Sequence, residues 1–372
     1  MSNVKNQISK VRQNMLGLRL KKKYVVLESD DWGAIRMASK NAFEKLLKKG
    51  YLVDHCAFNK NDTLESNSDL NKLFDLLSSI KTIEGKNPII TFNHIGANPD
   101  FVKIKNCDFA HYSYERFTTT LEKYPDHDKV FEFYNSAIAN NLMDVQFHGR
   151  EHVNVINWLD NLKKANKMAL DSFDYEMVST FPKSKSNCKS EFLDAFAIYE
   201  NNHDFVKSAI IDGLSLFEEY WKKSSISVIA PCYTWCEKIE SILKAQNVQA
   251  LQGGYVQVKP IKDGFKSIRH YTGEKNAQDQ IYLTRNCSFE PSVDPNKDWV
   301  SDCMKEISIS FFFKKPAIIN THRLNFISSL NPTNESSLYK FKILLHSIIK
   351  QWPEVEFVST EQLVGIIKNN SN

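Results

Sequence analysis

Two histidines four residues apart, His148 and His152, carry most of the chemical information in this sequence. On one turn of helix, residues at this spacing would aim both rings at one point, as a metal site with two imidazole ligands requires. The surrounding letters are HGREH rather than HExxH, which disfavours a zincin-type protease. A bare pair of this spacing is more often two unrelated histidines, but this one directly follows a predicted strand. We therefore interpret the pair as candidate metal ligands.

Asp30 and Asp31 form the second candidate group. Two adjacent residues at a strand end point in different directions, so their carboxylates can divide into different roles, one toward a metal and one toward a substrate or water. The alternative is that the pair caps a helix beginning near Ala34. Together with the two histidines, one aspartate would make a three-ligand site with an open position, the arrangement used for metal-activated water.

His322 is the third candidate, because a histidine with a pKa near neutrality can hand a proton to a leaving group. Alone, it would more often be a hydrogen-bonded structural histidine. Asp294 and Asp298, with Trp299 directly after, could orient it and stabilise its charge. The same two aspartates could instead belong to a solvent-exposed turn.

The candidate residues follow short apolar runs that are typical of buried parallel strands. Eight such runs alternate with longer helical stretches, the pattern of strands covered by helices. Eight is the number that a closed (β/α) barrel needs, and active sites of such barrels lie at the carboxyl ends of the strands. The predicted strands cover residues 24–29, 88–92, 143–147, 226–230, 248–251, 281–284, 317–320 and 355–358. Amphipathic helices are predicted at 68–80, 128–140, 188–201 and 337–351.

Three regions lack a regular pattern, at about 53–67, 95–127 and 255–280. None is rich in Gly, Ser or Pro, so we interpret them as long loops of one domain rather than as linkers. Residues 1–20 are predicted to form an N-terminal helical extension, and residues 21–372 a single barrel with an insertion at about 53–127.

Composition excludes several classes of protein. The 372 residues are 42% hydrophobic and 25% charged, as in ordinary globular proteins rather than disordered or membrane proteins. The net charge of +4 gives no reason to expect nucleic acid as a partner. Seven cysteines without a CxxC indicate reduced thiols, and a cysteine metal site is disfavoured. Without an apolar run of signal-peptide or membrane-spanning length, we expect a cytoplasmic protein with no transmembrane segment.

The order of these motifs resembles the polysaccharide deacetylase (NodB-type) family, which comprises metal-dependent carbohydrate deacetylases. The segment LESDDWG is similar to the first family motif, which implies Asp30 as catalytic base and Asp31 as metal ligand. HGREH is similar to the second motif, which implies His148 and His152 as the other two ligands.

Three later segments continue the resemblance, which extends from Tyr24 to about Ile367. IAPCYTW is similar to the third motif and implies that Pro231 and Tyr233 line the site, with the Tyr233 backbone N–H a candidate oxyanion donor. DPNKDW resembles the fourth motif, and INTH resembles the fifth, which implies His322 as general acid. The closing FVSTEQL is typical of the final strand and helix of the family.

The chain departs from the family pattern at three places. Ala230 stands where the family has an arginine that holds the catalytic aspartate, so we expect another guanidinium to hold Asp30, with Arg285 as first candidate and Arg150 as second. Asn320 occupies an aliphatic position of the fifth motif. The 117-residue gap from position 31 to position 148 is long, since 148 − 31 = 117.

The resemblance implies an α/β fold, a distorted or incomplete (β/α) barrel of seven to eight mostly parallel strands with long loops. It also implies removal of an acetyl group from an N-acetylated amino sugar or glycan, with Zn²⁺ as the expected metal and Fe²⁺, Co²⁺ or Ni²⁺ as alternatives. Trp32, Tyr233, Trp235 and Trp299 could narrow the site around one or two sugars by stacking, or could instead pack in the core. Two rival functions stay open, a catalytically impaired carbohydrate-binding barrel and an amidase acting on a small non-sugar C–N substrate. The sequence does not indicate an oligomeric state.

Overall fold

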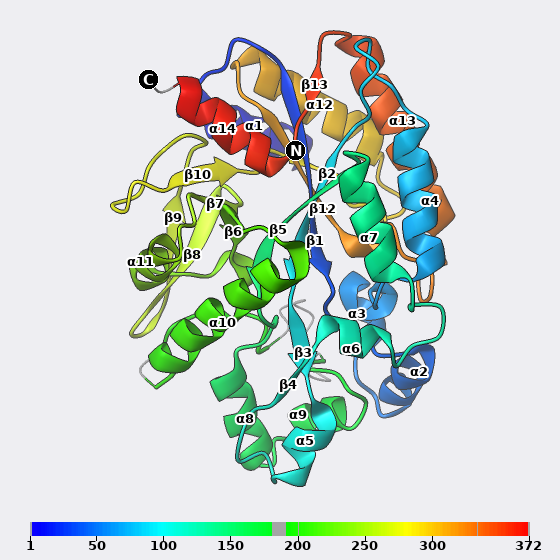
Figure 1. Cartoon of the computed structure of the whole chain (residues 1–372), viewed down its shortest axis with the longest axis vertical. Coiled ribbons are helices and arrows are strands. Elements are labelled where there is room, and N and C mark those ends of the chain that lie inside the picture. The colour runs from blue at the N-terminus through cyan, green and yellow to red at the C-terminus, as the bar shows by residue number, and fades with distance from the viewer. Residues whose placement is uncertain (1, 181–190, 200, 333, 371–372) are drawn as a thin grey trace.

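A nine-stranded sheet forms the centre of the molecule (Figure 1). The computed structural model describes residues 2–180, 191–199, 201–332 and 334–370, with side chains from residue 8 onward. The strands follow the order β10-β7-β6-β5-β2-β1-β12-β11, β13 also pairs with β1, and every pairing is parallel. Within the described residues the end strands β10 and β11 do not pair with each other, so the sheet is an open, distorted barrel. Its strands are β1 (Tyr24–Trp32), β2 (Ile90–Ile95), β5 (Met143–Gly149), β6 (Ser227–Ile229), β7 (Ala250–Gly253), β10 (Ile281–Thr284), β11 (Cys287–Ser288), β12 (Ala317–His322) and β13 (Glu356–Phe357).

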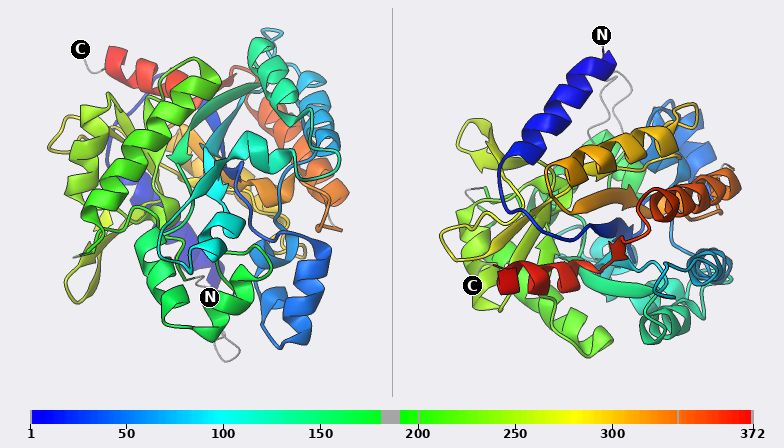
Figure 2. Two further views of the ribbon diagram at one scale, coloured as in Figure 1. Left: turned by 60° about the horizontal axis from the view of Figure 1, so that its bottom comes forward. Right: turned by 90° about the horizontal axis from the view of Figure 1, so that it is seen from above.

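Helices surround the curled sheet, as the view from above shows (Figure 2). They are α1 (Ser2–Met15), α2 (Lys40–Lys48), α3 (Ala57–Asn61), α4 (Asn67–Ser78), α5 (Phe101–Asn106), α6 (Phe117–Leu121), α7 (Val130–Ala139), α8 (Val155–Lys163), α9 (Lys167–Phe173), α10 (His203–Trp221), α11 (Glu237–Ala245), α12 (Trp299–Phe312), α13 (Asn334–Gln351) and α14 (Thr360–Asn370). Short 3₁₀ turns add η1 (Val53–His55), η2 (Pro231–Tyr233) and η3 (Arg323–Asn325). Among the described helices, none combines the length and hydropathy that crossing a bilayer requires.

The central strands are buried on both faces, which explains their continuous apolar sequence. On β1, Val25 and Leu27 pack in the largest hydrophobic cluster, whereas Val26 between them packs in a separate cluster with α14. All three side chains are fully buried. Successive residues of a strand point to opposite faces, so a strand with helices on one side and the barrel interior on the other needs apolar residues at every position.

The predicted barrel of parallel strands is confirmed, and each of the eight predicted strands overlaps a strand of the sheet. Prediction missed the two-residue β11 and two antiparallel hairpins, β3 (Ala97–Pro99) with β4 (Tyr114–Arg116) and β8 (Val256–Ile261) with β9 (Gly264–Arg269). β9 is almost entirely exposed, so it carries no apolar run. The predicted helix at 188–201 is wrong for residues 191–199, which form turns and irregular chain, and residues 188–190 and 200 lie outside the described part.

The N-terminal extension packs against the barrel. Lys10 on α1 pairs with Glu306 on α12 at 3.1 Å, and the buried Gln13 donates a hydrogen bond to the carbonyl oxygen of Arg285 at 2.6 Å. The stretch at 53–127, expected to be an insertion, includes β2, which lies between β1 and β5 near the middle of the sheet. The same stretch also contains η1, α3, α4, α5, α6 and the β3–β4 hairpin.

Candidate active site

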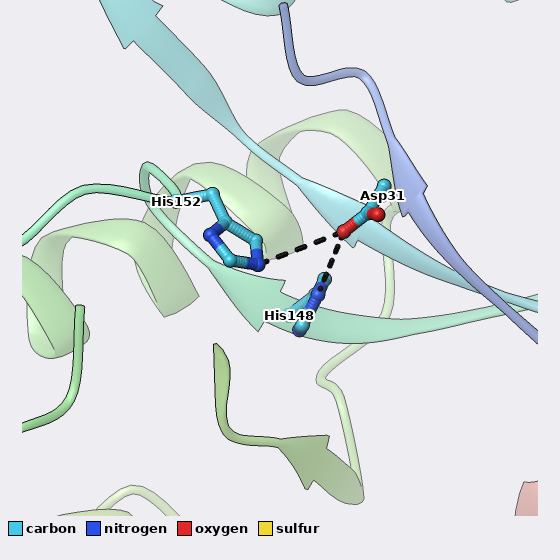
Figure 3. A group of neighbouring side chains, drawn as sticks. All are labelled: Asp31, His148 and His152. Atoms are coloured by element: carbon cyan, nitrogen blue, oxygen red, sulfur yellow. Dashed lines mark ion pairs between the residues drawn. The ribbon is translucent and has the colours of Figure 1, made fainter. Parts of the chain in front are cut away.

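The metal-ligand candidates Asp31, His148 and His152 meet at one end of the sheet (Figure 3). Asp31 lies near the end of β1 and His148 near the end of β5, while His152 lies in the loop that follows β5. The predicted helical turn between the histidines is wrong, because His148 belongs to a strand. The chain turns instead at Gly149, whose φ of 133° favours glycine.

The distances between these side chains suit a small divalent metal. Asp31 Oδ1 lies 3.4 Å from His148 Nε2 and 3.6 Å from His152 Nε2. Two ligands bound tetrahedrally at about 2.0–2.1 Å lie about 3.3–3.4 Å apart. One ligand atom from each of the three residues lies within 4.8 Å of the others. A carboxylate and two imidazoles in this arrangement therefore fit Zn²⁺ or a similar ion.

Hydrogen bonding and burial prepare the two histidines for this role. The Nδ1 atom of His148 lies 2.9 Å from the carbonyl oxygen of Ile229 on β6, which leaves Nε2 facing Asp31. Burial is the main cause that lowers the pKa of His152 to about 4, so its ring is neutral at pH 7, as a metal ligand must be. Burial would raise the pKa of Asp31, but its hydrogen bond with His148 and the neighbouring histidines hold it well below its usual range.

Backbone geometry separates the two adjacent aspartates. Asp31 has a φ of 74°, at the point where the β1–β2 register shifts. Gly33 follows with a φ of 81°, and a Cβ there would lie 2.4 Å from Cε1 of His94, so only glycine fits. The sharp turn lets Asp31 face the histidines, whereas Asp30 faces Arg285 across the barrel. The two aspartates do not cap a helix, because the chain near Ala34 is a turn.

Asp30 is held by a guanidinium from a distant part of the chain. Arg285 donates from Nη1 to Asp30 Oδ2 and from Nη2 to Asp30 Oδ1, both at 2.6 Å, and from Nε to Oε2 of Glu28, also at 2.6 Å. Asn93 donates a further hydrogen bond to Asp30 at 2.8 Å. Burial would raise the pKa of Asp30, but Arg285 lowers it to about 2. Arg285 thus occupies the place for which a replacement arginine was expected, while Arg150 pairs with Glu151.

His322 lies beside Asp30, with Nε2 of its ring 3.8 Å from Oδ2 of the carboxylate. Its other ring nitrogen, Nδ1, lies 2.6 Å from Oε1 of Glu290. Burial would lower the pKa of His322, but Glu290 and the two aspartates raise it to about 10. The ring is therefore protonated at neutral pH, the form in which it can donate a proton.

The prediction that Asp298 orients His322 is wrong. Asp298 is the N-cap of α12, where its side chain accepts a hydrogen bond from the backbone N–H of Ser301 at 3.0 Å. Asp294 forms a turn and accepts the indole N–H of Trp299 at its carbonyl oxygen. The carboxylate that pairs with the ring of His322 is instead that of Glu290. It follows β11, a strand too short to be predicted from its sequence.

Asn320 connects the two clusters. Its side-chain oxygen accepts a hydrogen bond from Nη1 of Arg285 at 2.7 Å, and its nitrogen donates to Oε1 of Glu290 at 3.2 Å. The departure from an aliphatic residue at this position therefore has a structural reason: the amide joins the group that holds Asp30 to the group that holds His322. Glu28, Glu290 and Asn320 were all missed as site residues, since only the fold brings them together.

Most of the aromatic residues expected to bind sugar lie in the core. Trp32 is fully buried and stacks on Phe92 with ring centroids 3.7 Å apart, because its strand faces the core at that position. Trp235 and Trp299 are 2% and 9% exposed and pack in the same hydrophobic cluster, so none of the three offers a face to a sugar.

The third-motif segment keeps one residue in contact with the site. Pro231 is buried as the first residue of η2. Tyr233 is half-buried, and its hydroxyl accepts a hydrogen bond from Nη1 of Arg285 at 3.2 Å. The Tyr233 backbone N–H donates to the carbonyl oxygen of Ala230 at 2.9 Å, so the expectation that it serves as an oxyanion donor is wrong for this conformation.

A small cavity of about 30 Å³ adjoins the metal-ligand candidates. Asp31 and His152 line it together with residues of other loops, including Arg36, Asp62 and Arg323. The remaining lining residues are Ala34, Ile35, Asn98, Pro99, Val153, Val178, Ser179 and Leu193. The cavity is thus lined by both charged and apolar side chains.

No protein-family model and no curated protein matches the chain. Among solved structures, the chain is similar to a protein from Mycobacterium smegmatis described as a polysaccharide deacetylase, at 9% identity and a TM-score of 0.47, over 96% of this chain and 94% of that one. It is similar to a 4-α-glucanotransferase from Thermococcus litoralis at 7% identity and a TM-score of 0.46, over 93% of this chain and 40% of that one. It is also similar to a CE4 family pseudoenzyme from Bacillus anthracis at 11% identity and a TM-score of 0.40, over 92% and 66% of the two chains. We therefore base the function on the side chains of the site itself.

Proposed function

We propose that the protein is a metal-dependent deacetylase that removes the acetyl group from an N-acetylated amino sugar. The observation that carries this proposal is the position of the Asp31–His148–His152 group beside an ionised aspartate and a protonated histidine. A metal centre next to a base and an acid is the set of groups that amide hydrolysis requires. The five segments that resemble the deacetylase motifs supply the substrate class.

Asp31, His148 and His152 would hold the metal. A divalent ion bound there would polarise the acetyl carbonyl and lower the pKa of a water molecule toward about 7. Asp30 accepts the proton of the attacking water. Its low pKa keeps it ionised at neutral pH, and Arg285 and Asn93 fix its position, but the same contacts make it a weak base.

His322 serves as the acid of the reaction. An amine is too basic to leave without a proton, so the departing nitrogen takes one from the imidazolium. Glu290 holds the ring at Nδ1, which keeps the ring charged and leaves Nε2 as the donor. The acetyl carbon thus becomes acetate, and the nitrogen leaves as the free amine.

Two alternatives remain as rivals. The missing arginine before Pro231 favours a carbohydrate-binding barrel without activity, but Arg285 supplies two hydrogen bonds to Asp30 from another strand end. An amidase for a small non-sugar substrate would use the same groups, and only substrate tests separate it from the proposed activity. We also propose a small or carrier-linked sugar as the substrate, rather than an insoluble polymer.

The test compares Asp30→Asn with Asp31→Asn after loading with Zn²⁺. We expect Asp30→Asn to keep the metal and to lower kcat for acetate release by about 10² to 10⁴, the usual range for a positioned base. Asp31→Asn should lose the metal. Asp298→Asn is the matched control, because it changes an aspartate at a helix cap to another good capping residue. The reverse pattern for the first two variants would show that their roles are exchanged, and metal-loaded protein that releases no acetate from any sugar would contradict the proposal.

A further inference from the structure

The N-terminal helix α1 carries apolar side chains on the face that points away from the barrel. Ile8 and Met15 are seven residues apart, about two turns of helix, so they lie on the same face. Their side chains are 48% and 51% exposed, and Leu16, which directly follows the helix, is 58% exposed. In the view from above, α1 lies at the edge of the molecule (Figure 2). About half of each of these three residues is therefore open to solvent.

The opposite face of α1 binds the barrel through polar contacts. Lys10, Gln13 and Asn14 lie on this face, because they are spaced by three and four residues. Nζ of Lys10 donates to the carbonyl oxygen of Asn286 at 2.9 Å, and Oδ1 of Asn14 accepts from Nδ2 of the same residue, also at 2.9 Å. A surface helix normally turns its apolar stripe toward the core and its polar face toward water. In α1 this arrangement is reversed, which marks the outer face as a surface for a partner.

The chain around this outer face is basic. Residues 1–23 contain seven Lys or Arg and no Asp or Glu. Arg12 is exposed and lies on the outer face itself, four residues after Ile8 and three before Met15. Apolar residues flanked by cations are typical of helices that lie on an anionic membrane surface.

The hairpin of β8 and β9 adds a further cation beside α1. The backbone N–H of Leu18 donates to the carbonyl oxygen of Thr272 at 2.8 Å, which brings the segment after α1 next to the end of β9. Arg269, the last residue of β9, is exposed. Burial is the main cause that raises the pKa of Tyr255, and the charges of Arg269 and Arg12 act in the opposite direction. Both guanidinium groups therefore lie near the Tyr255 hydroxyl and belong to one basic surface.

A second copy of the chain fits the outer face less well than an anionic surface does. Because Arg12 lies between Ile8 and Met15, a two-fold contact centred on this face would bring Arg12 against its own copy. The sequence of α1 offers no carboxylate that could compensate for this repulsion. Lipid phosphates supply negative charge to the cations, and the acyl chains below them take up the apolar side chains.

We propose that α1 docks on the surface of an anionic lipid bilayer, with Ile8, Met15 and Leu16 at the level of the acyl chains and Arg12 at the lipid phosphates. At 14 residues α1 is too short to cross a bilayer, so it lies in the plane of the membrane surface. The inference goes beyond the proposed function and does not rest on it, because it uses no side chain of the active site.

Co-sedimentation of the full chain with lipid vesicles tests this proposal. One set of vesicles is pure phosphatidylcholine, and the other contains about one-third phosphatidylglycerol. We expect binding to the anionic vesicles to be at least about tenfold tighter, and to weaken as the salt concentration rises. Equal binding to both sets, or no binding to the anionic vesicles, would overturn the proposal.

Variants of the outer face locate the contact. Ile8→Gln combined with Met15→Gln should weaken binding by about tenfold or more, because glutamine keeps the helix propensity but removes the apolar surface. Arg12→Glu should weaken it as well. The matched controls are Val102→Gln, at an exposed valine of α5, and Lys72→Glu, at an exposed lysine of α4. All of these positions are exposed, and thermal unfolding checks that each variant folds. Binding that both α1 variants leave unchanged would overturn the proposal.

Light scattering in the absence of vesicles tests whether a second copy covers the outer face instead. The parent and the Ile8→Gln, Met15→Gln double variant should have the same mass. A parental dimer that becomes a monomer in the double variant would overturn the proposal, because the apolar face would then be buried between two copies. None of these experiments measures acetate release, so their outcome is independent of that of the deacetylase tests.

Discussion

Two buried arginines each bind two carboxylates, but they hold them differently. Arg285 donates to both oxygens of Asp30 and to Glu28. Arg323 donates once to Asp62 and once to Glu65, and Oδ2 of Asp62 has no partner among the described residues. Among the described residues, every side-chain nitrogen and oxygen of Arg285, Asp30 and Glu28 has a partner, whereas Nη2 of Arg323 and Oδ2 of Asp62 have none.

The pKa values of the two aspartates differ accordingly. Burial raises the pKa of both, but Arg285 and its two hydrogen bonds lower that of Asp30 to about 2. At Asp62, burial outweighs the single hydrogen bond from Arg323, and the pKa rises to about 6. Two ion pairs of the same residue types therefore hold their aspartates in different states: Arg285 fixes an ionised carboxylate, whereas Arg323 lies beside a carboxyl of raised pKa in the wall of a cavity.

Arg285→Met tests the tighter cluster and should have the largest effect. It leaves Glu28 and Asp30 buried without their cation, which typically lowers the free energy of unfolding by about 3–5 kcal/mol. The pKa of Asp30 should rise, and acetate release should fall by at least about 10². Urea unfolding and steady-state kinetics measure both effects. In contrast, Arg116→Met, at an exposed pair, should cost about 1 kcal/mol or less, and an equally small change at Arg285 would invalidate the comparison.

Glu290→Gln tests the acid that faces Asp30. Without the carboxylate at Nδ1, the pKa of His322 should fall from about 10, and kcat should drop about 10- to 100-fold. A general acid works only while protonated, so activity is lost as pH rises through its pKa. The variant should lose activity at a lower pH than the parent, as a pH profile of kcat would show. If kcat of both proteins fell at the same alkaline pH, Glu290 would not be the group that keeps His322 protonated.

Asp62→Asn tests the looser cluster through the pH dependence of stability in metal-free protein. The folded-state pKa of Asp62 is raised from 3.8 to about 6, so the folded state binds its proton more tightly than the unfolded state. This group therefore makes the free energy of unfolding fall as pH rises from about 4 to 6, by roughly 1–3 kcal/mol. The asparagine variant should lack that contribution. A parental stability curve that rises over this range, with no difference in the variant, would contradict the assigned direction.

Asn320→Leu should have the smallest effect, because it removes only the link between the two functional clusters. Loss of the hydrogen bonds to Arg285 and Glu290 should lower the free energy of unfolding by about 1–2 kcal/mol and kcat severalfold. Leucine is also the kind of residue that the resemblance expects there. A double variant with Glu290→Gln would show whether the two changes are coupled, and strictly additive effects would argue against a connecting role.

The sequence predicted the strands, and it singled out three metal-ligand candidates that lie close together in the structure, because both predictions depend on local patterns. Apolar runs mark buried strands, and polar residues directly after them mark the end of the barrel where sites form. Glu290 and Asn320 carry no such local mark, since their partners are more than 30 residues away or on other strands. The sequence also leaves the role of the tryptophans open. A large aromatic residue near a motif can pack in the core or face a ligand, and only the fold shows which.

Metal content measured by elemental analysis tests the central claim most directly. Protein loaded with Zn²⁺ and then dialysed should contain about one ion per chain, and so should His346→Ala, which changes an exposed histidine on α13. His148→Ala and His152→Ala should each contain almost none, because two ligands alone hold the ion poorly. Undiminished metal in both of these variants would contradict the assigned centre and, with it, the proposed activity.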